Sequence, residues 1–297
     1  MSHTRRSPAH ADRARLLVVL GTASALFALE LAAGILTNSL ALIADAGHVL
    51  TDALGVGLAL VAITVAARAP SPRRTFGYQR LEILAAVVNA LVLLAVAVYV
   101  LLEAARRLRS EPEILGLPML AVATVGLGVN LFAVWLLRGA AKESLNMRGA
   151  YLEVLSDALG SAAVIAAALV ITFTGFTAAD AIASVLIGLL IVPRTWSLLR
   201  EALDVLLEAT PKGVDMAEVR RHILEAPGVR DVHDLHVWAI TSGMNVVSAH
   251  VIVQPNSDAA AILDHLCRCL GTQFDIDHST FQLETADRRP LETAAHR

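Results

Sequence analysis

Two pairs of side chains that can bind metal repeat at the same spacing. His48 lies four residues before Asp52, and Glu153 lies four residues before Asp157. Residues four apart share one face of an α-helix, so each pair can grip a single ion. The eight-residue segments that begin at His48 and Glu153 start 105 residues apart, match at six of eight positions and both end in glycine. One imidazole and three carboxylates suit a tetrahedral Zn²⁺, with other divalent first-row ions as alternatives.

The elements that position these pairs are expected to be membrane helices. The chain of 297 residues is 56% apolar and 17% charged, whereas soluble domains are about 45–50% apolar and about 25% charged. This composition excludes disorder and a small disulfide scaffold. The net charge of −3 gives no reason to expect nucleic-acid binding.

Six segments are expected to cross the bilayer, since a span needs about 20 apolar residues. Three of them contain no charged residue, and the other three contain few. The six segments are Leu16–Leu36, Leu40–Ala66, Ile83–Leu102, Ile114–Leu137, Ala158–Ala179 and Ala178–Leu199. We therefore expect residues 16–209 to form a transmembrane domain in the lipid bilayer.

The loops between these segments predict an orientation. Four Lys or Arg residues precede the first span, four lie in the segment 68–80 and three in the segment 138–148, whereas the turns at 37–39 and 175–177 have none and the loop after the third span has three. Because basic loops stay in the cytoplasm, both termini are expected there, with residues 1–15 as a cytoplasmic tail. The scarcity of lysine and the high alanine content favour a bacterial protein, hence one of the cytoplasmic (inner) membrane.

The charges within the apolar half are almost all acidic. Arg194 is the one Lys or Arg within the six segments, and the acids at or near membrane depth are Glu30, Asp45, Asp52, Glu82, Glu153, Asp157 and Asp180. A charge at a helix centre costs roughly 2.5–3.5 kcal/mol, so such acids need protons or a cation. The pattern indicates a cation pathway. For Asp45 and Asp180, a place in an ion-access route, a proton relay and simple hydrogen bonding all remain open.

Residues 210–297 are typical of a soluble domain, with 8 Lys or Arg and 12 Asp or Glu. Apolar spacing predicts helices at 215–225 and 258–270, and alternation predicts strands at 229–240, 245–253 and 279–284. The order helix, strand, strand, helix, strand fits a small α+β domain.

Four segments resemble the cation diffusion facilitator family, and most closely its zinc, cadmium and cobalt branch. They are Ser39–Ala53, Arg74–Glu82, Asn146–Asp157 and Asp234–Gly243. The resemblance implies a metal/proton antiporter: an all-α bundle of six transmembrane helices with a small α+β, ferredoxin-like and metallochaperone-like domain in the cytoplasm. It also implies a homodimer that senses cytoplasmic metal through this domain.

The resemblance places the family's paired transport motif on His48/Asp52 and Glu153/Asp157. In this branch a histidine is usual where this chain has Glu153, and an extra carboxylate makes the site harder and more anionic. That change favours Mn²⁺ or Fe²⁺ more than a site with two histidines would. Zinc remains the expected substrate, with Cd²⁺, Co²⁺, Mn²⁺ and Fe²⁺ as alternatives.

The C-terminal domain offers a second set of ligands. Its candidates are His233, His236, His250, His265, His278 and Glu284, and the resemblance favours His233, His250 and Glu284 as a cytoplasmic metal site. Gln282 stands where some relatives have a histidine ligand.

The function expected from these features is export of a divalent metal in exchange for protons, without enzymatic activity or a cofactor. An intramembrane metalloenzyme is one alternative, because polar clusters can activate water. A membrane metal sensor without transport is the other.

Overall fold

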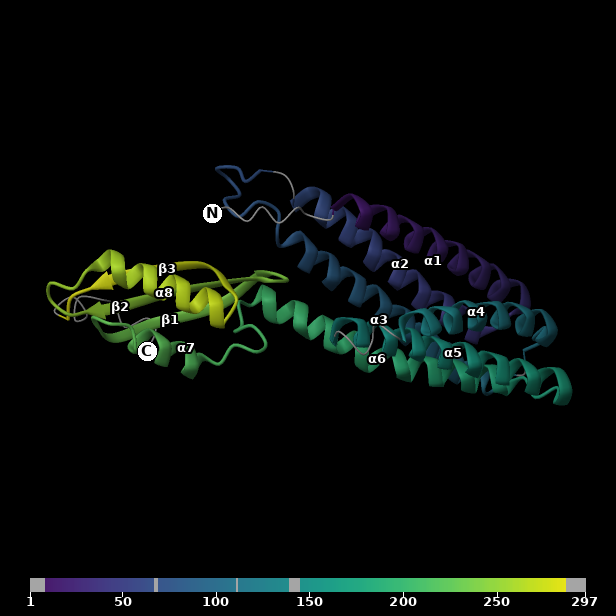
Figure 1. Ribbon diagram of the computed structural model, residues 1–297. Helices are drawn as coiled ribbons and strands as arrows, with labels where there is room; N and C mark the ends of the chain where they lie inside the picture. The colour runs from purple at the N-terminus through teal and green to yellow at the C-terminus, as the bar shows by residue number, and fades with distance from the viewer. Residues whose placement is uncertain (1–8, 67–68, 111, 139–144, 287–297) are drawn as a thin grey trace. The chain divides into compact units, whose positions relative to one another are not determined.

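The computed structural model describes residues 9–66, 69–110, 112–138 and 145–286 (Figure 1). Within them the chain forms eight α-helices and three β-strands. The helices are α1 (Ala9–Thr37), α2 (Leu40–Ala66), α3 (Leu81–Arg107), α4 (Gly116–Leu137), α5 (Leu145–Thr174), α6 (Ala178–Leu206), α7 (Met216–Leu224) and α8 (Ala259–Gln273). The strands are β1 (Val229–Thr241), β2 (Met244–Val253) and β3 (Ile276–Glu284).

The six expected membrane helices are all present as helices. Among the described residues, α1, α3, α4, α5 and α6 each contain a stretch long and apolar enough to cross a membrane. Helix α2 is continuous over 27 residues and has the predicted bounds. The sequence therefore located the helices of the membrane region correctly.

The bounds of α5 differ from the prediction. This helix begins at Leu145 rather than Ala158, and it ends at Thr174 rather than Ala179. The predicted span was chosen for its lack of charge, whereas a helix continues through polar residues because each backbone N–H bonds four residues back. Gly175 ends α5 with φ of 71°, and its N–H donates to the carbonyl of Ile171 at 2.9 Å. That left-handed conformation is one that glycine adopts without strain.

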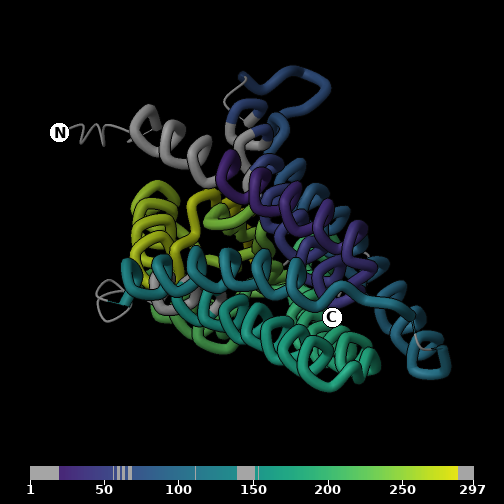
Figure 2. The backbone as a smooth tube through the Cα atoms, turned by 90° about the vertical axis from the view of Figure 1, so that its right-hand side faces the viewer, coloured from purple at the N-terminus to yellow at the C-terminus, as the bar shows by residue number. Residues whose placement is uncertain are grey.

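The chain divides into two compact units. One comprises Met1–Thr64 and Ala85–Leu199, and the other comprises Val65–Leu84 and Arg200–Arg297. In the first unit, α4 and α5 run side by side (Figure 2), and α1 also contacts α4. The buried core of this unit is rich in alanine. Small side chains let helices approach closely in a membrane.

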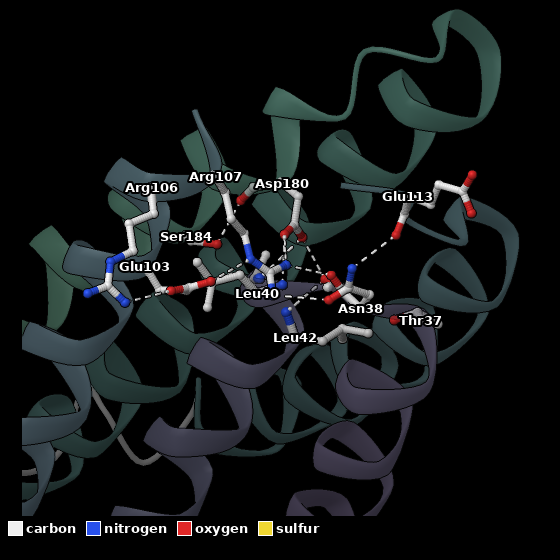
Figure 3. Close-up of polar contacts among 12 residues, drawn as sticks. Thr37, Asn38, Leu40, Leu42, Glu103, Arg106, Arg107, Glu113, Asp180 and Ser184 are labelled. Carbon is white, nitrogen blue, oxygen red and sulfur yellow. Dashed lines mark hydrogen bonds and ion pairs between the residues drawn. The ribbon is translucent and has the colours of Figure 1, made fainter. Parts of the chain in front are cut away.

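A buried polar network joins three helices of the first unit (Figure 3). Asp180, at the start of α6, is fully buried and accepts from Ser39 Oγ at 2.6 Å and from the backbone N–H of Leu40 at 2.7 Å. Arg107 of α3 lies 3.8 Å from the same carboxylate and donates to the carbonyl of Asn38 at 2.6 Å. Asp180 thus satisfies amides at the start of α2, which a helix leaves without internal partners. Of the three roles open for Asp180, the structure supports hydrogen bonding.

The second unit contains a three-stranded sheet in the order β1-β2-β3. Strands β1 and β2 are antiparallel, and β3 is parallel to β2 after the crossover through α8. Helices α7 and α8 contact each other and pack on β1 and β3, respectively. The side chains of Asp215 and Asp258 cap α7 and α8, respectively, by accepting hydrogen bonds from backbone N–H groups of the first turn. The predicted α+β domain is confirmed, with β3 beginning three residues earlier than expected.

The second unit also contains Glu82, which the sequence placed near membrane depth. Its carboxylate accepts a hydrogen bond from Thr241 Oγ1 at 2.5 Å. Glu82 therefore belongs to a polar contact with the end of β1.

Candidate metal centres

The first candidate centre lies between α2 and α5. Asp157 Oδ1 is 2.8 Å from Nε2 of His48, and Asp52 Oδ2 is 3.8 Å from the same nitrogen. One ligand atom from each of the three residues lies within 4.8 Å of the other two. The i, i+4 spacing puts His48 and Asp52 on one face of α2, and the packing of α5 supplies Asp157. We call these three residues the intramembrane cluster.

The spacing of the intramembrane cluster is compatible with a tetrahedral ion. Ligand atoms about 2.1 Å from one such ion lie about 3.4 Å apart, and the two distances to His48 Nε2 fall on either side of that value. The spacing of the cluster is therefore close to the one that a tetrahedral cation requires. His48 is 8% exposed, so its ring is largely shielded from solvent.

Glu153, the fourth predicted ligand, lies on α5 one turn before Asp157. Its backbone belongs to the described helix, but its side chain lies outside the described residues. The structure thus brings three of the four predicted ligands together.

A small cavity of about 30 Å³ adjoins the intramembrane cluster. That volume is enough for one water-sized particle. Its lining includes Asp45 and Gly160 beside His48 and Asp157, together with four residues of α6: Ile187, Leu190, Ile191 and Arg194. The sequence pattern missed α6 as a wall of the site. Arg194, the lone basic residue within the six segments, was the signal that could have found this wall.

Asp45 of α2 lines the same cavity and contacts further polar side chains beyond it. It is 5% exposed and accepts a hydrogen bond from Ser161 Oγ at 3.4 Å. Asn130 of α4 donates to the same hydroxyl at 3.3 Å. Glu30 of α1 is buried against α4, where a Cβ on Gly126 would lie 2.9 Å from its Oε1. The polar residues of four helices therefore gather around the predicted metal site.

The glycines that end the two repeated segments do not force close helix approach. A Cβ at Gly55 would lie 3.6 Å from Asn89 Nδ2, and one at Gly160 would lie 3.7 Å from Asp45 Oδ1. Both are ordinary contacts. Close approach is required instead at Gly47, where a Cβ would lie 2.6 Å from Val96 Cγ1, so α2 and α3 meet at this point.

The second candidate centre lies on the sheet of the second unit. His233 of β1 is the direct cross-strand partner of His250 of β2, and their ring centroids are 5.2 Å apart. Glu284 of β3 is the cross-strand partner of Ile252 of β2. Ile252 lies two residues after His250, so Glu284 and His250 are on the same face of the sheet. Its Oε1 lies 3.1 Å from His250 Nδ1, and its Oε2 lies 3.8 Å from His233 Nε2. We call these three residues the sheet cluster.

The sheet cluster has the chemistry of a metal site. Its ligand atoms all lie within 4.8 Å of one another. Glu284 is 3% exposed, and within the described part of the chain its Oε2 has no hydrogen-bond donor. A buried carboxylate oxygen without a donor is costly unless a cation or proton satisfies it.

The other histidines predicted as candidates lie elsewhere. His236 contacts Asp234 at 3.0 Å, His265 is exposed on α8, and the ring of His278 packs edge-on against Phe76. Gln282 donates to Glu284 Oε1 rather than occupying a ligand position. The structure thus gathers the three residues that the resemblance favoured.

Comparison with known proteins identifies the family. Residues 16–207 match the model of the cation efflux transmembrane domain, and residues 211–286 match that of the cation efflux protein cytoplasmic domain. The chain belongs to the cation diffusion facilitator family. It is therefore a multi-pass membrane protein from a family of metal cation transporters, not of enzymes, and the metalloenzyme alternative is dropped.

Individual members of the family are similar along nearly the whole chain. The metal cation efflux system protein CzcD of Cupriavidus metallidurans is 46% identical over 99% of this chain and 93% of its own length. The zinc transporter ZitB of Escherichia coli is 41% identical over 95% of this chain and 91% of its own length. The cadmium, cobalt and zinc/H(+)-K(+) antiporter of Bacillus subtilis is 39% identical over 86% and 84%.

A solved structure also matches in sequence. It is the metal-bound C-terminal domain of the CzcD transporter from Cupriavidus metallidurans, with 43% sequence identity. The match covers 24% of this chain and 99% of the chain in that structure, and the TM-score is 0.23.

Proposed function

We propose that this protein exports a divalent transition-metal cation, with Zn²⁺ as its main substrate, in exchange for protons. The observation that carries the proposal is the convergence of His48, Asp52 and Asp157 from two membrane helices, with ligand atoms within 4.8 Å. Glu153, one turn from Asp157, is proposed as the fourth ligand. Relatives named as zinc transporters support zinc as the substrate.

Proton exchange follows from the chemistry of these ligands. Nitrogen and carboxylate ligands bind a metal only when deprotonated, so metal binding releases protons and protonation releases metal. Histidine, with an ordinary pKa near 6.5, changes charge in the range of cellular pH. A metal ion that arrives from the cytoplasm would replace the proton shared by His48 and Asp157. Protons from the other side would then displace the metal once the site opens there.

Transport is tested by reconstituting the full chain in liposomes with an imposed pH gradient. We expect Zn²⁺ flux that follows the gradient and ceases when an ionophore collapses it, with Cd²⁺, Co²⁺, Fe²⁺ and Mn²⁺ measured in parallel. Flux that ignores the gradient would refute proton exchange. Metal binding without any flux would instead identify a membrane metal sensor.

Exchange of Glu153 for histidine is expected to raise the ratio of Zn²⁺ to Mn²⁺ flux by about tenfold, which corresponds to about 1.4 kcal/mol. A second imidazole makes the donor set softer and less anionic, which favours Zn²⁺ over a harder ion. Competition between the two metals in the liposome assay measures the ratio. Glu153→Asp, which keeps the carboxylate, is the control and should leave the ratio near that of the wild type. An unchanged ratio in Glu153→His would contradict a role of Glu153 in selectivity.

The sheet cluster is proposed as a regulatory site for the same metal in the cytoplasm. The supporting observation is the buried Glu284 carboxylate between two histidines. We further propose that both termini face the cytoplasm, that the protein lies in the bacterial inner membrane and that it works as a homodimer through the domain at 211–286.

The variant His250→Ala is expected to bind one equivalent of Zn²⁺ per chain less than the wild type. Because the remaining His233 and Glu284 offer only two ligands, the site would lose at least about 10-fold in affinity. Equilibrium dialysis of the full chain measures the stoichiometry. His265→Ala, on the exposed surface of α8, is the matched control and should bind as many ions as the wild type. Equal stoichiometry in all three proteins would show that the sheet cluster holds no metal.

A further inference from the structure

Glu30 of α1 is a buried acid with an unsatisfied oxygen. Its side chain is 1% exposed, and among the described residues its Oε2 has no hydrogen-bond donor. Gly126 of α4 forms part of its surroundings, since an added Cβ there would lie 2.9 Å from Glu30 Oε1. A charged carboxylate shielded from water is far more costly than a protonated one. Glu30 therefore needs a proton or a cation.

The groups that act electrostatically on Glu30 are two acids and one histidine. Asp45 of α2 has the largest effect, followed by His48 of α2 and Asp157 of α5. Helix α4, which also packs on α1, contains no titratable residue. Asp45 is itself buried, and its carboxylate accepts a hydrogen bond from Ser161 Oγ at 3.4 Å. Two neighbouring carboxylates away from water do not both ionise, so the pair holds a proton unless a cation lies beside it.

Glu30 and Asp45 lack the ligands of a metal site of their own. A divalent transition metal is usually held by about four ligands. Within the described part of the chain, the groups of three or more ligand atoms within 4.8 Å of one another are the intramembrane cluster and the sheet cluster. Neither group includes Glu30 or Asp45. A proton needs only one carboxylate oxygen, so it is the occupant that this pair fits.

The pair lies on one side of the intramembrane cluster. Asp45 precedes His48 by three residues, about 4.5 Å along α2, and is nearer the turn that joins α1 to α2. Glu30 lies seven residues before Thr37, where α1 ends at the same turn. With both termini in the cytoplasm, as proposed above, this turn faces the outside. Asp45 also lines the cavity beside His48, so it links Glu30 to the metal site from the outer side.

We propose that Glu30 and Asp45 share one exchangeable proton, which leaves when a metal ion enters the intramembrane cluster and returns from the outside before the ion is released. The charge of the ion stabilises both carboxylates in their ionised form, so the proton is released to the cytoplasm. A proton that reaches the pair from the outside removes a negative charge beside the ion and weakens its binding. One proton thus moves inward for each exported ion. This inference rests on the proposed transport function and names a proton carrier that is not a metal ligand.

The first test counts the protons released for each Zn²⁺ bound by the full chain in weakly buffered detergent solution. His250→Ala is the parent protein, because zinc then no longer occupies the sheet cluster. We expect Glu30→Gln, which cannot carry an acidic proton, to bind as many ions as the parent but to release about one proton fewer per ion. Glu30→Asp keeps the carboxyl group and is the matched control, with the proton count of the parent. Equal counts in Glu30→Gln and the parent would overturn the proposal.

Infrared difference spectra test the same proton without relying on Glu30→Gln. Addition of Zn²⁺ to the His250→Ala parent should remove a carbonyl band of a protonated carboxylic acid, and Glu30→Asp should shift the frequency of that band. A parent without this loss, or a band that Glu30→Asp leaves unshifted, would overturn the proposal even if Glu30→Gln does not fold. Zinc flux by the wild type in liposomes is measured separately. Its absence would refute the transport function, whereas flux together with unchanged proton counts would refute only the role of Glu30.

Discussion

Replacement of Asp157 by alanine is expected to reduce Zn²⁺ flux to the level of protein-free liposomes. Its Oδ1 lies 2.8 Å from His48 Nε2, so the substitution removes one proposed ligand and the group that orients another. Loss of a partner that only orients a ligand costs about 10–100-fold. Loss of a ligand together with that orientation should cost more, and initial rates of zinc uptake under a pH gradient measure it.

Two further variants separate the metal-binding role of Asp157 from packing. Asp157→Asn keeps the shape and can still hydrogen-bond His48, but it removes the negative charge, so flux should again fall by more than about 10-fold. Ser156→Ala is the matched control, because Ser156 lines the same cavity on the same helix and is not a proposed ligand. Its flux should stay within about twofold of the wild type. Transport at the wild-type rate by Asp157→Ala would place the metal elsewhere.

The sequence predicted the helices of the membrane region better than their ends. Apolar runs located all six helices because lipid requires long apolar segments. The start of α5 was misplaced by 13 residues, since a hydropathy criterion stops at charges and a helix does not. In the second unit, apolar spacing located the two helices and alternation located the three strands, because each element buries one face.

The candidate transport site was predictable where its residues share a helix or belong to the repeated segment. The i, i+4 spacing fixed His48 with Asp52, and the repeat suggested that α5 faces α2. That Asp45 and Arg194 line the same cavity depends on helix packing, which no local spacing encodes. The difference between Asp45 and Asp180 was equally hidden, because each is an acid in an apolar segment outside the repeated motif.

Replacement of Asp180 by alanine is expected to lower the thermal stability of the protein strongly. The side chain is fully buried and accepts hydrogen bonds from Ser39 Oγ and from the N–H of Leu40, while Arg107 lies 3.8 Å away. The buried N–H groups of Leu40 and Ala41 lose their acceptor, which costs about 1–3 kcal/mol for each buried donor. Loss of the ion pair with Arg107 adds to that, although Glu103 remains 3.3 Å from Arg107. The melting temperature in detergent, followed by circular dichroism, measures the loss.

The control for Asp180→Ala is Ser184→Ala. Ser184 Oγ donates to the backbone carbonyl of Asp180 at 2.7 Å, so this neighbour belongs to the same turn of α6 but carries no charge, and its loss should cost about 1 kcal/mol. A melting temperature equal to that of the wild type in Asp180→Ala would contradict the structural role. Asp180→Asn sharpens the comparison because the amide keeps an acceptor for α2 while removing one of the two carboxylates beside Arg107. If Asp180→Asn is nearly as unstable as Asp180→Ala, the charge pair with Arg107 dominates. If it is nearly as stable as the wild type, the capping of α2 dominates.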